Sequence, residues 1–222
     1  MGRGYAAEEG GVDLPPIKEN FHRNDLPEGF RYQSDFISPH QERSLLSEFE
    51  GLEFQLFDFH GYIAKRRIVE YGFEYDFRAR KAAASLPIPD FLKRLRDNAA
   101  GWSAIEPDEI VQAVITEYTP GSPIGWHRDV PQFETIVGIS LNSSCRLRFK
   151  PYGSEGNIAA VTLEPRSVYV MRGIARWNFQ HSIPAVKALR YSITFRTLRK
   201  RAFQKSKSDG RMRLHRKTIS IG

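Results

Sequence analysis

Apolar residues recur at every second position through most of the second half of the chain. This alternation is typical of β-strands that bury one face. We therefore expect strands at 134–141, 145–150, 157–163, 167–171, 175–182 and 188–198, separated by turn residues. Short strands at this spacing predict a sandwich, a jelly roll or a barrel rather than alternating strands and helices.

The first half of the chain contains two predicted helices. Ser38 is placed as an N-cap, with Pro39 at the first helical position and Gln41 closing a capping box. An apolar stripe follows, and Gly51 ends this helix. A second helix is expected at 90–99.

Between and after these helices, the pattern again favours strands. Segment 53–77 mixes alternating apolar residues with aromatic ones, and we interpret it as two or three strands with turns at Gly61 and Gly72. A helix or loop near 107–112 leads into a strand at 113–118. The chain is therefore expected to be mainly β, with helices in its N-terminal half.

The positive charge of the chain is concentrated at its C-terminal end. The 222 residues carry 33 Lys and Arg against 26 Asp and Glu, a formal net charge of +7. Residues 199–222 hold nine basic residues and one acidic residue, which leaves a net charge of −1 for 1–198. We therefore expect a flexible Gly- and Pro-rich arm at 1–28, a folded domain at 29–198 and a basic, disordered tail at 199–222. The hydrophobic fraction of 41% excludes a wholly disordered chain.

Cysteine usage and hydropathy both favour a cytoplasmic protein. The single cysteine, Cys145, cannot form an internal disulfide, which is typical of a reducing compartment. Its place in an alternating strand favours a buried core residue over a catalytic thiol. No apolar run approaches the roughly 18 residues of a membrane span, and the acidic N-terminus is not a secretory signal. We expect a monomer with no membrane partner.

The segment that carries most chemistry is Gly125-Trp126-His127-Arg128-Asp129. On an extended strand His127 and Asp129 would point to the same face, because residues two apart do so. His181 lies in a later predicted strand and is the natural third member, since the other histidines fall in tails, a helix start or a turn. Two histidines and one carboxylate form a facial triad that holds Fe(II) and leaves coordination positions open. Alone, His-x-Asp also arises by chance in surface turns.

A second polar row lies on the strand Leu189 to Arg196. Arg190, Ser192, Thr194 and Arg196 share one face, while the residues between them are apolar. Arg190 and Arg196 stand at the two ends of this row, with the two hydroxyls between them. This face is either solvated or an anion-binding floor for a dicarboxylate, because the planar guanidinium matches a carboxylate.

As a set, these motifs resemble the AlkB family of Fe(II)/2-oxoglutarate dioxygenases over roughly residues 30–198. The family pattern is H-x-D, then H, then R-x-N-x-T-x-R, and the run Glu117 to Gly121 is similar to the family's tyrosine lead-in. The resemblance implies a double-stranded β-helix, that is a jelly roll, with flanking N-terminal helices and a lid hairpin. It also implies Fe(II), 2-oxoglutarate and O2 as cofactor and cosubstrates.

The resemblance also implies roles for single residues. His127, Asp129 and His181 match the iron ligands. Tyr118, Arg190, Ser192, Thr194 and Arg196 match 2-oxoglutarate contacts, and Arg176 is similar to an arginine that precedes the second metal histidine. Segment 62–81 resembles a nucleotide-recognition lid, in which the expected contacts to phosphates and a base come from Lys65, Arg66, Arg67, Tyr71 and Tyr75. Tyrosines in strands are also common core residues, whereas Trp126 is expected to pack on the strand face opposite His127.

The implied activity is oxidative removal of N-alkyl groups from bases of DNA or RNA, with release of formaldehyde, succinate and CO2. The sequence departs from the family at Ser192, where the family has Asn, at Thr116, and at Pro131, where many base-repairing members carry an acid. Three alternatives stay open: the same chemistry on a protein or tRNA, a jelly-roll binding module without catalysis, and a nucleic-acid-binding protein that works through its basic tail.

Overall fold

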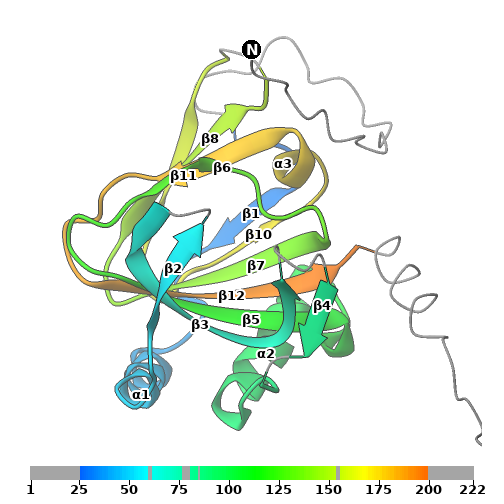
Figure 1. Cartoon of the computed structure of the whole chain (residues 1–222). Helices are drawn as coiled ribbons and strands as arrows, with labels where there is room; N and C mark the ends of the chain where they lie inside the picture. The colour runs from blue at the N-terminus through cyan, green and yellow to red at the C-terminus, as the bar shows by residue number, and fades with distance from the viewer. Residues whose placement is uncertain (1–25, 60–61, 77–80, 85, 154–155, 200–222) are drawn as a thin grey trace, which may run out of the picture.

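The chain folds into two antiparallel sheets that face each other, with helices beneath the larger one (Figure 1). The computed structural model describes residues 26–59, 62–76, 81–84, 86–153 and 156–199, with the backbone alone at 57–59, 62–64, 74–76 and 81–84. The larger sheet has the order β1-β10-β7-β12-β5-β3-β2, with β4 paired to β3, and the smaller has the order β6-β11-β8-β9.

The strands of the larger sheet are β1 (Phe30–Gln33), β2 (Gln55–Phe59), β3 (Tyr62–Asp76), β4 (Lys81–Ala84), β5 (Ile110–Tyr118), β7 (Phe133–Leu141), β10 (Val168–Met171) and β12 (Arg190–Leu198). Those of the smaller sheet are β6 (Ile124–His127), β8 (Cys145–Pro151), β9 (Ala159–Leu163) and β11 (Phe179–Ile183). From β5 to β12 the chain passes back and forth between the sheets. This is the jelly roll, or double-stranded β-helix, that the sequence predicts.

Two amphipathic helices cover the outer face of the larger sheet (Figure 1). They are α1 (Pro39–Phe49) and α2 (Asp90–Ser103). The predicted capping box is present, because Gln41 N donates to Ser38 Oγ at 3.2 Å and Ser38 N donates to Gln41 Oε1 at 2.9 Å. Buried residues of both helices pack on β12 and its neighbours, including Ile193 and Phe195. Within the described ranges, no helix is long and apolar enough to cross a membrane.

The alternation along β12 places the site between the sheets. Its apolar residues Ile193 and Phe195 are fully buried in the helix-side core. Its polar residues therefore face the interior between the two sheets, where a second core contains Leu147 and Phe149 of the smaller sheet. Cys145 belongs to this second core and is buried, as expected.

Two predictions about local structure were wrong. Gly72 is not a turn but lies inside β3, with φ +88°. A side chain at this position would clash with the Val111 carbonyl oxygen of β5, so β3 needs a glycine where it passes β5. The expected strand at 175–182 is divided: Gly173–Trp177 forms a short helix, α3, and β11 begins at Phe179. The expected turn at Gly61 lies outside the described residues.

Several boundaries also differ. The helix expected at 90–99 continues to Ser103, and a 3-10 turn, η1 (Pro107–Glu109), precedes β5. The strand β1 had no prediction of its own; it pairs with β10 through Phe30 opposite Met171. At the end of the domain, Arg199 N donates to Gln132 O at 2.8 Å, so this first residue of the expected tail contacts the folded body.

Candidate active site

A cavity of about 600 Å³ opens between the two sheets. Its floor comes from β5 and β12, one wall from β3, and the opposite wall from β6 and β11. The residues of the sequence motifs that line it are Tyr118, His127, Asp129, His181, Arg190, Ser192, Thr194 and Arg196. The structure therefore gathers in one cavity the residues expected to bind metal and cosubstrate.

His127, Asp129 and His181 lie side by side in this cavity. His127 at the end of β6 is directly opposite His181 of β11, and their ring centroids are 4.2 Å apart. Asp129 follows β6 in a loop rather than on the strand, yet its Oδ2 approaches His181 Nε2 to 3.6 Å. Among the described residues, no group of three His, Cys, Asp or Glu side chains is arranged so that it could hold a metal ion without rearrangement. His127, Asp129 and His181 are nevertheless adjacent.

The electrostatics of this cluster suit metal ligands. Burial lowers the pKa of His181 to about 3 and also lowers that of His127, so both imidazoles are neutral at pH 7. His127 Nδ1 lies 2.9 Å from the Gly125 carbonyl oxygen, which can only accept, so Nε2 keeps the lone pair. Burial is the largest single effect on Asp129 and opposes its ionisation, but the neighbouring groups, Arg196 first among them and Arg176 also included, together hold the pKa of Asp129 below its ordinary value.

The buried carboxylate of Asp129 uses its two oxygens differently. Oδ1 accepts a hydrogen bond from Arg196 Nη2 at 2.9 Å. Oδ2 is buried and has no hydrogen-bond partner among the described residues. A buried carboxylate oxygen without a donor is costly, whereas a cation bound beside His127 and His181 would satisfy it. The donor set therefore fits a divalent metal such as Fe(II).

Gln112 of β5 holds the arginine that contacts Asp129. Its Oε1 accepts from Arg196 Nη1 at 2.9 Å, and its own Nε2 donates to the Phe73 carbonyl oxygen at 2.8 Å. A chain of hydrogen bonds thus connects strand β3 to Asp129; it runs from Phe73 through Gln112 and Arg196. Gln112 was not predicted as a site residue from the sequence, although it lies opposite Arg196 in the β5–β12 pairing.

Arg190 forms a cationic site at the other end of the polar row. It is 1% exposed, its Nε donates to Ser140 Oγ at 3.2 Å, and its Cζ lies 4.7 Å from the ring centroid of Tyr118. Its Nη1 is buried with no hydrogen-bond partner in the described part of the chain. A buried guanidinium that lines a cavity and has an N–H group without a partner fits a carboxylate ligand. The interpretation of this face as a solvated surface was therefore wrong.

Arg176 shapes the loop that carries Asp129. It sits in α3, is 3% exposed, and its Nη2 donates to the carbonyl oxygens of Asp129, Val130 and Phe133 at 3.0, 2.8 and 3.0 Å. These contacts fix the backbone on both sides of Pro131, which is exposed. Arg176 therefore holds in place the backbone of the loop that carries Asp129.

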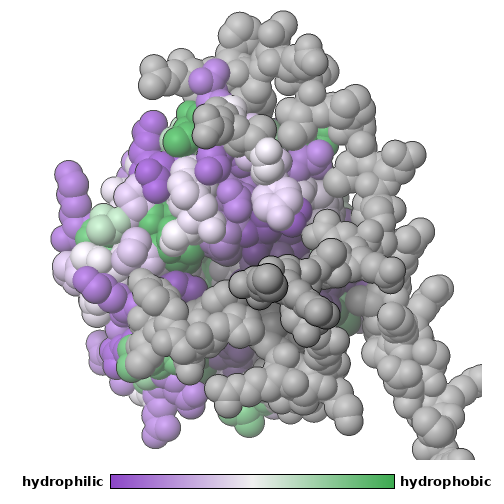
Figure 2. All heavy atoms as spheres, turned by 45° about the horizontal axis from the view of Figure 1, so that its top comes forward, coloured by the Kyte–Doolittle hydropathy of each residue, from purple (hydrophilic) through white to green (hydrophobic). Residues whose placement is uncertain are grey.

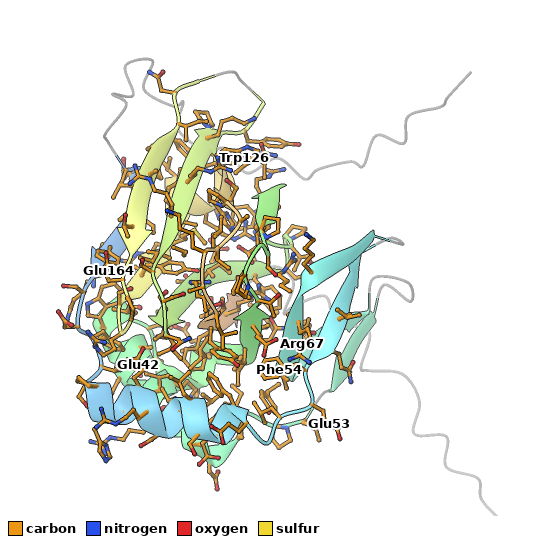
Figure 3. The ribbon with its side chains drawn as sticks, turned by 90° about the vertical axis from the view of Figure 1, so that its left-hand side faces the viewer. Glu42, Glu53, Phe54, Arg67, Trp126 and Glu164 are labelled. Atoms are coloured by element: carbon orange, nitrogen blue, oxygen red, sulfur yellow. The ribbon has the colours of Figure 1, made fainter. Side chains whose placement is uncertain are left out.

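The expected substrate contacts are divided between the two faces of β3. Arg66 lines the cavity, while Arg67 points away and pairs with Glu117 through two hydrogen bonds of 2.8 and 3.0 Å (Figure 3). Lys65 is exposed on the same face as Arg67.

Of the two tyrosines expected to approach a base, the structure describes the side chain of one. Tyr71 is 7% exposed in the helix-side core, so the expectation that it approaches a base was wrong. The side chain of Tyr75 lies outside the described residues.

The cavity has lining residues on β3 that the sequence analysis did not single out. Ile68 and Glu70 line it together with Arg66, because residues two apart on a strand share a face. In the described part of the chain, Glu70 and Asp129 are the acidic residues of the lining. Alternation starting from Arg66 would have identified both residues, since all three precede Gly72 on the same predicted strand.

Comparison with known proteins agrees with this geometry. Residues 53–213 match the family model described as 2OG-Fe(II) oxygenase superfamily. The chain therefore belongs to this superfamily and is AlkB-like. It is accordingly a dioxygenase, and membership implies Fe(II), 2-oxoglutarate and O2.

The relatives span different shares of the chain. Uncharacterized protein L905 of Acanthamoeba polyphaga mimivirus is 27% identical over 187 residues, which cover 77% of this chain and 85% of that protein. The tRNA (carboxymethyluridine(34)-5-O)-methyltransferases ALKBH8 of Xenopus tropicalis and Mus musculus are each 28% identical, over 71% and 74% of this chain. The chain spans about a quarter of their length, 25% and 26%. The solved structure of OsALKBH1 matches with a TM-score of 0.62 and 16% identity, over 80% of this chain and 99% of that one, and shows the shared fold.

Proposed function

We propose that the protein is an oxidative demethylase that removes N-alkyl groups from nucleic-acid bases. The observation that carries this proposal is the buried cluster of two neutral imidazoles and one carboxylate, whose Oδ2 has no donor in the described part of the chain. The cluster opens into a cavity that also contains the buried cation Arg190. Metal donors and an anion site in one cavity suit a metal enzyme with an acidic cosubstrate.

In this proposal His127 Nε2, His181 and Asp129 Oδ2 hold Fe(II). When bound, iron supplies the activation of O2 that the side chains cannot perform. Arg196 and Gln112 keep the Asp129 carboxylate ionised and fixed in place. Burial keeps both histidines neutral, and therefore able to bind a metal, at physiological pH.

Arg190 binds the distal carboxylate of 2-oxoglutarate through its forked N–H groups. Tyr118, Ser192 and Thr194 line the path between this cation and the metal donors, and supply hydroxyl groups for the cosubstrate. One oxygen atom of O2 enters succinate as CO2 leaves. The other enters the N-alkyl carbon, so a methyl group departs as formaldehyde and the base keeps a hydrogen.

The substrate enters from the side of β3. A base must leave a duplex stack or come from a single strand to reach donors this deeply buried. Arg66 supplies a positive charge at the cavity, and Glu70 can accept a hydrogen bond from an exocyclic amine. Glu70 would then take the part of the acid that the family places where this chain has Pro131.

A second candidate is a modified nucleoside of tRNA, treated by the same chemistry. It is favoured by the relatives whose names state a tRNA substrate. Their methyltransferase activity is not carried over, because the chain spans only about a quarter of their length.

A panel experiment tests both candidates. The protein is incubated with Fe(II), 2-oxoglutarate and single- and double-stranded DNA, RNA and tRNA that carry 1-methyladenine, 3-methylcytosine or etheno bases, and products are identified by mass spectrometry. We expect loss of the alkyl group with wild-type protein and none with His127→Ala, whereas Arg94→Gln on the outer face of α2 serves as an active control. Glu70→Gln should change the order of preferred bases.

The outcomes separate the open alternatives. If wild-type protein converts 2-oxoglutarate to succinate but alters no member of the panel, the proposed substrate class is wrong. A protein that acts only as a binding module, or through its tail, would bind nucleic acid in a salt-sensitive manner that survives His127→Ala. Such binding, without conversion of 2-oxoglutarate or of the alkylated base by wild-type protein, would refute the proposed demethylation.

A further inference from the structure

The smaller sheet carries positive charge without acidic residues. None of its described strands, β6, β8, β9 and β11, contains Asp or Glu, although residues 1–198 as a whole have a net charge of −1. Strand β8 places Arg146, Arg148 and Lys150 on one face, since Cys145, Leu147 and Phe149 between them are buried. Basic residues are therefore concentrated on the outer face of the sheet that contains His127 and His181.

The basic face is organised around Trp126. Arg148 Cζ lies 4.9 Å and Lys150 Nζ lies 5.3 Å from the Trp126 ring centroid. Arg148 Nε also donates to Ser182 Oγ of β11 at 3.0 Å. Trp126 does point away from His127, as expected, but it packs against two cations rather than against an apolar core. These contacts hold the cationic groups on the sheet.

This face continues to the mouth of the cavity. Trp126 and Arg128 both line the cavity, and Arg128 Cζ lies 3.6 Å from the ring centroid of Tyr152, which is 50% exposed. Trp126 lies at the end of the molecule opposite Glu42 of α1 (Figure 3). Figure 2, which brings the top of Figure 1 forward, shows mainly hydrophilic residues with smaller apolar patches between them in the coloured part of the surface.

We propose that the outer face of the smaller sheet binds the sugar-phosphate backbone of a single strand next to the target base. We name this surface the β8 face and define it by Arg146, Arg148, Lys150, Trp126 and Arg128. Side chains two apart on a strand are about 6.6–6.8 Å apart, so β8 presents a row of spaced cations to a polyanion. The half-exposed ring of Tyr152, which lies beside Arg128, suits a single strand, whose bases can stack. The inference rests on the proposed nucleic-acid substrate.

Titration of an oligonucleotide that extends beyond the cavity on both sides tests this inference. The test variant is Arg146→Gln with Lys150→Gln, which leaves the Arg148 contact to Ser182 in place. The matched control is Arg43→Gln with Arg94→Gln, which removes the same charge from exposed positions of α1 and α2. A charge-preserving variant, Arg146→Lys with Lys150→Arg, tests for rescue. Fluorescence anisotropy between about 50 and 200 mM salt gives the slope of log K against log salt.

We expect the test variant to bind more weakly and its slope to fall by about 1.4, because each single-strand phosphate contact contributes roughly 0.7. The control and the charge-preserving variant should keep the wild-type slope. If wild-type protein binds and demethylates the oligonucleotide and the test variant binds equally well, the β8 face is not the binding surface and the proposed function stands. If wild-type protein turns over 2-oxoglutarate but binds no oligonucleotide, both proposals fail.

Discussion

Arg196 donates a hydrogen bond to Asp129 Oδ1 at 2.9 Å and leaves Oδ2 of the same carboxylate without a donor, 3.6 Å from His181 Nε2. The arginine thereby fixes which oxygen can serve a metal. Against the larger opposing effect of burial, Arg196 is also the first of several neighbouring groups that together hold the pKa of Asp129 below its ordinary value. Because Gln112 in turn accepts from Arg196 Nη1, the Asp129 carboxylate, a proposed metal ligand, is supported by a neighbouring strand of the larger sheet.

Replacing Arg196 should weaken metal binding. Arg196→Gln keeps the cavity polar but removes the charge that orients Asp129, so we expect Mn(II), as an oxygen-stable substitute for Fe(II), to bind about 10–100-fold more weakly. Arg196→Lys should fall between this variant and wild type, because lysine keeps charge without the fork. Anaerobic titration with Mn(II) measures the metal affinity of each variant, with Arg94→Gln as control. An Arg196→Gln variant that binds Mn(II) as tightly as wild type would contradict the role of Arg196.

Replacing Arg190 should affect the cosubstrate rather than the metal. In Arg190→Lys the charge remains, but the paired N–H groups that match a carboxylate are lost. We expect the apparent affinity for 2-oxoglutarate to fall by roughly tenfold, the equivalent of 1.4 kcal/mol, while Mn(II) affinity is retained. A variant that binds 2-oxoglutarate as well as wild type would show that the carboxylate binds elsewhere.

Arg66 and Arg67 are adjacent, but their loss should have different consequences. Arg67→Gln leaves Glu117 buried with Tyr191 Oη as its remaining donor, at 3.2 Å. Since Arg67 is half-exposed and screened, we expect a loss of about 1 kcal/mol and a Tm lower by about 2–4 °C. Arg66→Gln should keep the wild-type Tm and lower turnover of the nucleic-acid substrate. Thermal unfolding and turnover are measured for both variants. A lower Tm in Arg66→Gln together with lower turnover in Arg67→Gln would contradict the assignment.

Burial raises the pKa of the Cys145 thiol. The thiolate is the nucleophile, so a raised pKa leaves less of the reactive form at a given pH. We expect native protein at pH 8.5 to resist iodoacetamide and unfolded protein to react with it, with a single adduct in mass spectra because the chain has one cysteine. Alkylation of the native protein at the rate of a free thiol would mean that Cys145 is not a core residue.

The polar row of β12 was predictable because strand alternation is a local property. Arg190, Ser192, Thr194 and Arg196 share a face wherever this strand is placed, and the apolar residues between them require a core. The capping box of α1 was predictable for the same reason, since its donors and acceptors lie within four residues. His127 and His181 are 54 positions apart, so strand alternation could not pair them; His181 was selected by elimination among the histidines, and the family resemblance agreed with that choice.

The predictions that were wrong all concern features that depend on contacts between residues far apart in the sequence. Gly72 looks like a turn locally, but β5 passes so close that only glycine fits within the strand there. Tyr71 looks available to a base until the helices cover its face of β3. The helix α3 is stabilised by Arg176, whose acceptors lie more than 40 positions earlier in the chain. Patterns within a segment cannot indicate such partners.

The most direct test of the proposed demethylase measures succinate and formaldehyde together. Wild-type protein with Fe(II), 2-oxoglutarate, O2 and its best alkylated oligonucleotide should release the two products in equal amounts, with one repaired base for each. His181→Ala should release neither, and Arg94→Gln should match wild type. Succinate without formaldehyde or a repaired base, across the whole panel, would contradict oxidative demethylation of nucleic acid.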